Sequence, residues 1–204
     1  MDSSNHWNKV YSTKAETEVS WFQEVPTKSL ELIKELQLPL SASIIDIGGG
    51  DSRLVDSLLE MGFSNLAILD ISSVSLEKAR LRLKEKSHQV NYITSDVTTF
   101  KSEAKFDLWH DRATFHFLNT IDDVEKYLSI AYACLNPGGN LIISTFSKNG
   151  PEKCSGLPVT QYSETELKAL FGKYFQNTKC FEDIHKTPWG TEQAFVYCGF
   201  KKKS

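Results

Sequence analysis

Residues 44–62, IIDIGGGDSRLVDSLLEMG, contain the feature that most restricts the fold, three consecutive glycines between an apolar run and a segment with helical periodicity. A short run of branched apolar residues is typical of a buried strand, whereas apolar residues three and four positions apart are typical of a helix. Glycine at the junction permits a tight turn and lets a ligand come close to the backbone. The stretch therefore predicts a strand, a ligand-binding turn and a helix.

The rest of the chain continues this alternation. Strand-like runs occur at 42–47, 65–72, 89–97, 106–111 and 140–146, and helical patterns at 27–39, 52–62, 73–86, 122–135 and 163–175, with a Pro-Gly-Gly turn at 137–139. Strands that alternate with helices predict a mainly parallel sheet covered by helices on both faces. The chain ends differently, because two β-like stretches are joined by the short turn PWG and must be antiparallel neighbours.

Composition limits the partners that a chain of this kind can have. It has 204 residues, 24% of them charged, and a net charge of −3, which gives no basic footprint for nucleic acid. No apolar run is long enough to cross a bilayer and no presequence is evident, so we expect a cytoplasmic protein without a nucleic-acid or membrane partner. The four cysteines form no CxxC pair and are expected to be reduced thiols, with no metal site.

Acidic residues stand at the ends of three predicted strands, at Asp46, Asp70 and Asp96. Ligands of open α/β sheets bind outside these strand ends, and Asp70 follows the glycines at the offset from which a carboxylate can accept both ribose hydroxyls. Three carboxylates disfavour a polyanion. Arg53 replaces the third glycine of a dinucleotide fingerprint, and no Walker A lysine is present. The set favours an adenosine joined to a cationic group, a description that fits S-adenosylmethionine.

Five motifs in order carry a family resemblance from residue 41 onward: IIDIGGGDS, ILDIS, TSDVTTF, FDLWHDRATFHFL and LNPGGNLIIS. Together they resemble the class I S-adenosylmethionine-dependent methyltransferases. The resemblance implies a Rossmann-like, mostly parallel seven-stranded sheet whose last strand is antiparallel. It also implies S-adenosyl-L-methionine as the cofactor and S-adenosyl-L-homocysteine as the product.

The resemblance further implies which residues hold the cofactor. The loop of Asp46, Gly48, Gly49 and Gly50 would approach the methionine moiety, with Asp46 near its ammonium group. Asp70 would accept from the ribose hydroxyls. The adenine would be held by Ile71 on its face and by Asp96 and Val97 at its edge.

Residues 1–40 are expected to form a helical, aromatic lid over a core at 41–204, within one domain. Trp7 and Tyr11 lie in this segment and are either packing residues or aromatic faces near the sulfonium, where cation–π attraction operates. The loop at 149–163 is long enough to line an acceptor pocket.

The stretch WHDRATFHFL, residues 109–118, supplies the candidates for catalysis. His110 and Asp111 would lie near the transferred methyl group because the fourth strand ends there. His110 is also a cofactor contact and the better candidate for a general base. Asp111 either positions the acceptor or pairs with Arg112, and His116 is expected to be a hydrogen-bonded core histidine.

The resulting expectation is a methyltransferase that acts on an oxygen, nitrogen or sulfur atom of a small molecule, as a monomer or weak homodimer. The alternative is a protein-lysine N-methyltransferase. The N-terminal aromatic pattern HWNKVY…WF resembles the opening of eukaryotic lysine methyltransferases that act on elongation factor 1A. A third possibility is a non-catalytic protein that binds S-adenosylmethionine.

Overall fold

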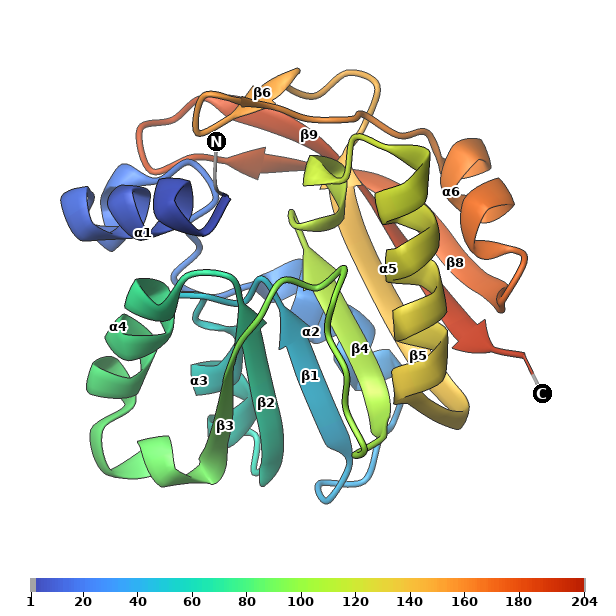
Figure 1. Cartoon of the computed structure of the whole chain (residues 1–204), viewed down its shortest axis with the longest axis horizontal. Helices are drawn as coiled ribbons and strands as arrows, with labels where there is room; N and C mark the ends of the chain where they lie inside the picture. Colours follow the sequence, from blue (N-terminus) through green and yellow to red (C-terminus); the bar gives the residue numbers. More distant parts are fainter. Residues whose placement is uncertain (1–2, 204) are drawn as a thin grey trace.

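The computed structural model describes residues 3–203 and is built on a seven-stranded sheet in the order β3-β2-β1-β4-β5-β9-β8 (Figure 1). The strands are β1 Ser43–Ile47, β2 Asn65–Asp70, β3 Val90–Thr94, β4 Phe106–Arg112, β5 Leu135–Phe146, β8 Phe175–Lys186 and β9 Glu192–Lys202. The first five are parallel, and β9 runs antiparallel to both of its neighbours. The predicted Rossmann-like α/β fold with an antiparallel C-terminal hairpin is confirmed.

Helices cover both faces of this sheet (Figure 1). One layer comprises α2 Thr27–Glu35, α3 Leu54–Glu60 and α4 Ser73–Leu83, and the other comprises α5 Ile121–Cys134 and α6 Glu164–Phe171. Short 3-10 helices lie at Glu16–Glu18, Lys84–Gln89 and Phe115–Phe117, and β6 Lys153–Cys154 pairs with β7 Leu157–Pro158. None of the helices within residues 3–203 is long and apolar enough to cross a membrane.

The N-terminal helix α1 Ser3–Thr13 belongs to neither layer. It lies beyond the carboxyl-terminal ends of β1 and β2, next to α4 (Figure 1). The predicted helical segment over the core is therefore present, and it covers the edge of the sheet at which the strand-end acids meet.

Successive side chains of β1 divide between two hydrophobic cores. Ile45 and Ile47 pack in the core under α5 and α6, whereas Ile44 packs in the core under α2, α3 and α4. This division follows from the two-residue period of a strand. A sheet buried on both faces also explains why β1 reads as a continuous apolar run interrupted only by Asp46.

The segment at 137–139, predicted as a turn, lies inside β5. Gly138 has a φ of +70°, and the register between β4 and β5 shifts between Phe106 and Leu108. The Pro-Gly-Gly sequence therefore produces an irregular strand start instead of a separate turn.

The expectation that all four cysteines are reduced thiols is wrong for two of them. Cys180 on β8 lies directly opposite Cys198 on β9, and the two form a disulfide. The spacing in sequence gave no sign of this pair, because only the register of the hairpin brings the two residues together. Cys134 and Cys154 are free and buried.

This disulfide should stabilise the hairpin at the edge of the sheet. It joins residues 18 positions apart, and a loop of that size corresponds to about 3 kcal/mol of unfolding free energy. Thermal unfolding with and without reductant should show a lower Tm in the reduced protein, and the double variant C180A/C198A should not respond to reductant. A wild-type Tm that is insensitive to reductant would contradict the assignment.

Candidate functional site

A cavity of about 350 Å³ lies at the carboxyl-terminal edge of the sheet, under α1. Its lining comes from the ends of β1, β2, β3 and β4, from α1 and from the β6–β7 hairpin. Ten of the lining residues carry the discussion below: Trp7, Tyr11, Trp21, Gly48, Asp70, Ile71, Asp96, Val97, Arg112 and Phe117. A smaller cavity of about 50 Å³ adjoins it on the other side of the glycine loop, beside Asp46 and His110.

The glycines are required by the shape of the loop. Gly48 and Gly50 have φ values of +60° and +41°, which side chains rarely adopt. A Cβ on Gly49 would lie 2.5 Å from an oxygen of Asp46, and one on Gly48 would collide with Thr114. The backbone of Gly48 consequently borders both cavities, where a ligand can approach it directly.

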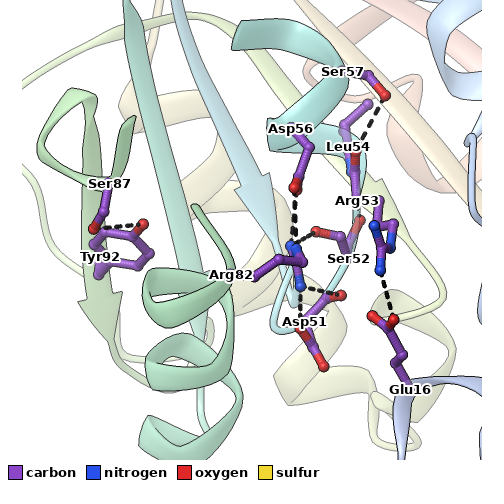
Figure 2. Close-up of polar contacts among 10 residues, drawn as sticks. All are labelled: Glu16, Asp51, Ser52, Arg53, Leu54, Asp56, Ser57, Arg82, Ser87 and Tyr92. Atoms are coloured by element: carbon purple, nitrogen blue, oxygen red, sulfur yellow. Dashed lines mark hydrogen bonds and ion pairs between the residues drawn. The ribbon is translucent and has the colours of Figure 1, made fainter. Parts of the chain in front are cut away.

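Charged residues hold this loop from two sides (Figure 2). Arg82 of α4 pairs with both Asp51 and Asp56, and it donates to the carbonyl of Ser52 at 2.8 Å. Arg53 points away from the β1–α3 junction and pairs with Glu16. The bulk of Arg53 argues against a dinucleotide. Its ion pair with Glu16 also joins the N-terminal segment to the glycine loop.

Asp70 at the end of β2 is the most perturbed acid lining the larger cavity. Its side chain accepts a hydrogen bond of 2.7 Å from the backbone N–H of Ser72 and lies near Gly50. Burial raises the pKa of Asp70 to about 7, although hydrogen bonds from Ser72 and Ser75 oppose the shift. A buried carboxylate of this kind gains most from a ligand that donates hydrogen bonds to it.

The predicted adenine residues also lie at the larger cavity. Ile71, Asp96 and Val97 line it, beyond the ends of β2 and β3. One oxygen of Asp96 accepts from the N–H and hydroxyl of Thr98, at 2.8 and 2.7 Å. These contacts fix the direction of the carboxylate at the rim.

Four aromatic rings form the roof of the cavity. The ring centroid of Trp7 lies 5.1 Å from Phe117, 5.8 Å from Trp21 and 6.2 Å from Tyr11. Asn8 connects helix α1 to the start of α4, because its side-chain oxygen accepts a hydrogen bond of 2.8 Å from the hydroxyl of Ser72. Trp7 and Tyr11 are therefore packing residues that also form part of the cavity wall. Their place near a sulfonium stays a prediction.

His110 does not face the larger cavity. Its Nδ1 lies 2.6 Å from Asp46 and its Nε2 lies 2.8 Å from the hydroxyl of Ser29, and all three side chains are buried. Both ring nitrogens are engaged inside the protein, so the geometry favours a positioning role over proton transfer to an acceptor. Asp46 likewise borders only the smaller cavity. Ser29 was missed because nothing in its local sequence distinguishes it from a helix-surface serine.

Asp111 points to the opposite face of β4. It accepts from the hydroxyl of Tyr127 at 2.7 Å and from the backbone N–H of Thr114 at 3.0 Å, and it lines neither cavity. Burial raises the pKa of Asp111 to about 6. A pairing with Arg112 is wrong, because consecutive strand residues point to opposite faces. Asp111 instead shapes the turn that places Thr114 against Gly48.

His116 is buried, as expected, but it is not hydrogen-bonded. Neither ring nitrogen has a partner among residues 3–203, and the ring stacks on Phe146 with centroids 4.6 Å apart. Burial lowers the pKa of His116 to about 3, so the ring is neutral near pH 7. Aromatic stacking replaces the expected hydrogen bonds.

The loop at 149–163 contributes some of its residues to the lining of the larger cavity. Cys154, Leu157 and Pro158 line the larger cavity. Tyr162 instead packs into the core, with its ring centroid 5.3 Å from that of Phe115.

Among residues 3–203 no cluster of three or more histidine, cysteine, aspartate or glutamate side chains is suited to hold a metal ion.

Residues 45–141, which contain the glycine loop and the first strand-end acids, match a family model described as a methyltransferase domain. Residues 45–141 thus resemble a methyltransferase domain. The chain is 32% identical over 165 residues to malonyl-acyl-carrier protein O-methyltransferase 1 of Ilyobacter polytropus, covering 76% of this chain and 60% of that protein. The chain thus spans less than two thirds of that relative.

Two further similarities extend the comparison. EEF1A lysine methyltransferase 2 of Danio rerio is 26% identical over 160 residues, covering 71% of this chain and 69% of that protein. The crystal structure of Burkholderia thailandensis 1,6-didemethyltoxoflavin-N1-methyltransferase, with bound 1,6-didemethyltoxoflavin and S-adenosylhomocysteine, superposes with a TM-score of 0.71. Its identity is 20%, with 99% of this chain and 84% of that chain covered, so it supports the fold.

Binding of S-adenosylhomocysteine should depend on the ionisation of Asp70. Ribose hydroxyls would donate to its carboxylate form, and burial raises the pKa of Asp70 to about 7. Affinity should therefore fall by about tenfold for each pH unit below that value and level off above it. Calorimetric titrations over this range should show the slope, and Asp70→Asn should bind weakly without it. An equal slope in the variant would assign the proton to another group.

Replacement of His110 by leucine should destabilise the fold, because it leaves the buried Asp46 and Ser29 without their partner. Loss of buried hydrogen-bond partners costs about 1–3 kcal/mol. Urea unfolding should show this loss, and Ser29→Ala, which removes only the bond to Nε2, should show a smaller one. Unchanged stability of His110→Leu would contradict the positioning role.

Proposed function

We propose that this chain is an S-adenosylmethionine-dependent methyltransferase that acts on a small molecule. One observation carries the proposal: groups of two chemical kinds line the larger cavity. Asp70, Ile71 and Asp96 are suited to adenosine, and we assign them to an adenosine end. Trp7, Trp21 and Phe117 provide an aromatic lining, which we assign to the acceptor compartment. Gly48 belongs to the same lining.

The residues of the site would act chiefly by binding and orientation. S-adenosylmethionine supplies an activated methyl group that is transferred by in-line displacement. Asp70 would hold the ribose, and Asp96 with Val97 would hold the adenine edge. The aromatic roof excludes water from the reacting atoms and presents ring faces that favour a cation. Proximity of this kind can supply a large share of the acceleration, so no general base is required.

The closed roof supports a small-molecule acceptor. An acceptor must fit between α1 and the β6–β7 hairpin, in a compartment lined by Trp7, Trp21, Phe117 and Leu157. The relative from Ilyobacter polytropus bears the name of an O-methyltransferase, which is compatible with this acceptor class. The methylated atom is oxygen, nitrogen or sulfur.

A protein lysine is the second candidate acceptor. It is supported by the similarity to EEF1A lysine methyltransferase 2, of which the chain covers 69%. The two acceptor classes are distinguished by incubating cell extract with the enzyme and methyl-labelled S-adenosylmethionine. A labelled small molecule other than S-adenosylmethionine that forms only with the enzyme supports the proposal, whereas label on a protein band supports the alternative.

The cofactor assignment is tested by calorimetry with S-adenosylhomocysteine and, separately, NAD. The wild type should bind S-adenosylhomocysteine and not NAD. Asp70→Ala should weaken the binding by at least about tenfold, because it removes charge-assisted hydrogen bonds. Asp122→Ala is the matched control, since Asp122 is exposed on α5 and lies outside both cavities. Binding of NAD instead would refute the assignment.

A further inference from the structure

Arg112 at the end of β4 is a largely enclosed cation with incomplete bonding. Its Nη1 donates to the carbonyl of Trp21 at 2.9 Å, and the guanidinium lies 5.1 Å from the ring centroid of Phe195. Nε and Nη2 are buried and have no hydrogen-bond partner among residues 3–203. None of the ion pairs found in that part of the chain includes Arg112.

A guanidinium in this state is unfavourable until an anion reaches it. Burial removes water from the charge, and two of its donor groups have nothing to replace that water. The side chain borders both cavities, so a ligand in either one lies close to it. The fork of a guanidinium matches a carboxylate, which accepts two parallel hydrogen bonds.

The charges around the larger cavity favour an anion that belongs to the acceptor. Of the carboxylates that line the cavity, Asp70 and Asp96 lie at the proposed adenosine end. Asp123 is bonded to Thr120 and paired with Lys126. The proposed acceptor compartment is otherwise apolar or weakly polar, with Trp7, Trp21, Ala113, Phe117, Cys154 and Leu157. Arg112 is the one cation that lines the larger cavity among the residues described.

The cofactor contains a carboxylate of its own, on the methionine moiety. Lys14, Arg53 and Lys78 line the smaller cavity beside Gly49, and of these Arg53 is already paired with Glu16. Lys14 and Lys78 are therefore the alternative partners for the cofactor carboxylate, whereas an acidic acceptor in the larger cavity would have no other positive partner among its described lining residues.

We propose that Arg112 binds a carboxylate of the acceptor, so that the enzyme selects an anionic small molecule with an aromatic or otherwise apolar body. This inference rests on the proposed methyltransferase function and narrows its substrate class. The aromatic roof would contact the apolar body, while the guanidinium fixes its acidic end. Arg112 is accordingly a specificity-determining residue.

Matched acid and amide pairs test this inference. Salicylate, phenylacetate and cinnamate, each beside its primary amide, are titrated into the protein saturated with S-adenosylhomocysteine. The wild type should bind at least one acid about tenfold or more tightly than its amide, since only the acid pairs with the cation. Arg112→Gln should remove this preference, and Arg112→Lys should retain part of it. Arg80→Gln is the charge-matched control, because Arg80 is exposed on α4 and stacks on Tyr92.

Binding of S-adenosylhomocysteine and of methylthioadenosine, which lacks the amino-acid moiety, separates the two carboxylate sources and verifies the fold of each variant. The inference expects Arg112→Gln to bind both nucleosides as the wild type does. Selective loss of S-adenosylhomocysteine binding would show that Arg112 holds the cofactor carboxylate and would overturn the inference. It is also overturned if no acid exceeds its amide in the wild type, or if the preference survives in Arg112→Gln. Failure of the wild type to bind S-adenosylhomocysteine would instead refute the methyltransferase function itself.

Discussion

The parallel pairing of β1 with β2 on one side and β4 on the other is the constraint on which the site depends. Asp46 lies opposite Ile68 in one pairing and His110 in the other, so three strand ends meet at one edge of the sheet. The chain order reverses between β1 and β4, and such switch points leave a crevice beyond the strand ends. Residues more than sixty positions apart in sequence thereby become neighbours.

The same edge concentrates groups that are costly to bury. Asp70, His110 and Asp111 are all nearly inaccessible to water. The latter two are compensated inside the protein, by Ser29 and Asp46 in one case and by Tyr127 and Thr114 in the other. Asp70 also accepts a hydrogen bond from the backbone of Ser72, but it lines the larger cavity, whereas Asp111 lines neither cavity. Access to the cavity therefore separates a group that a ligand can reach from groups that shape the site.

Periodicity and motif order were sufficient to predict the sheet, its hairpin and the acids at the strand ends, because these properties are local in sequence. What failed depended on direction or register. Asp111 and Arg112 are adjacent in sequence yet point to opposite faces, and Cys180 meets Cys198 only through the register of β8 and β9. Pairing with Arg112 was one of two alternatives for Asp111, and the alternation of side chains along a strand excludes it.

The N-terminal segment joins the wall of the larger cavity to the glycine loop. It contributes Trp7 and Trp21 to the cavity lining, and it is tied to the glycine loop through Glu16 and Arg53. The carbonyl of Trp21 also accepts the hydrogen bond from Arg112, so this segment orients the guanidinium. One segment therefore positions a cation at the glycine loop, Arg53, and a cation at the cavity wall, Arg112. The shape of the cavity and the direction of its one described cation consequently depend on residues that precede the sheet in the sequence.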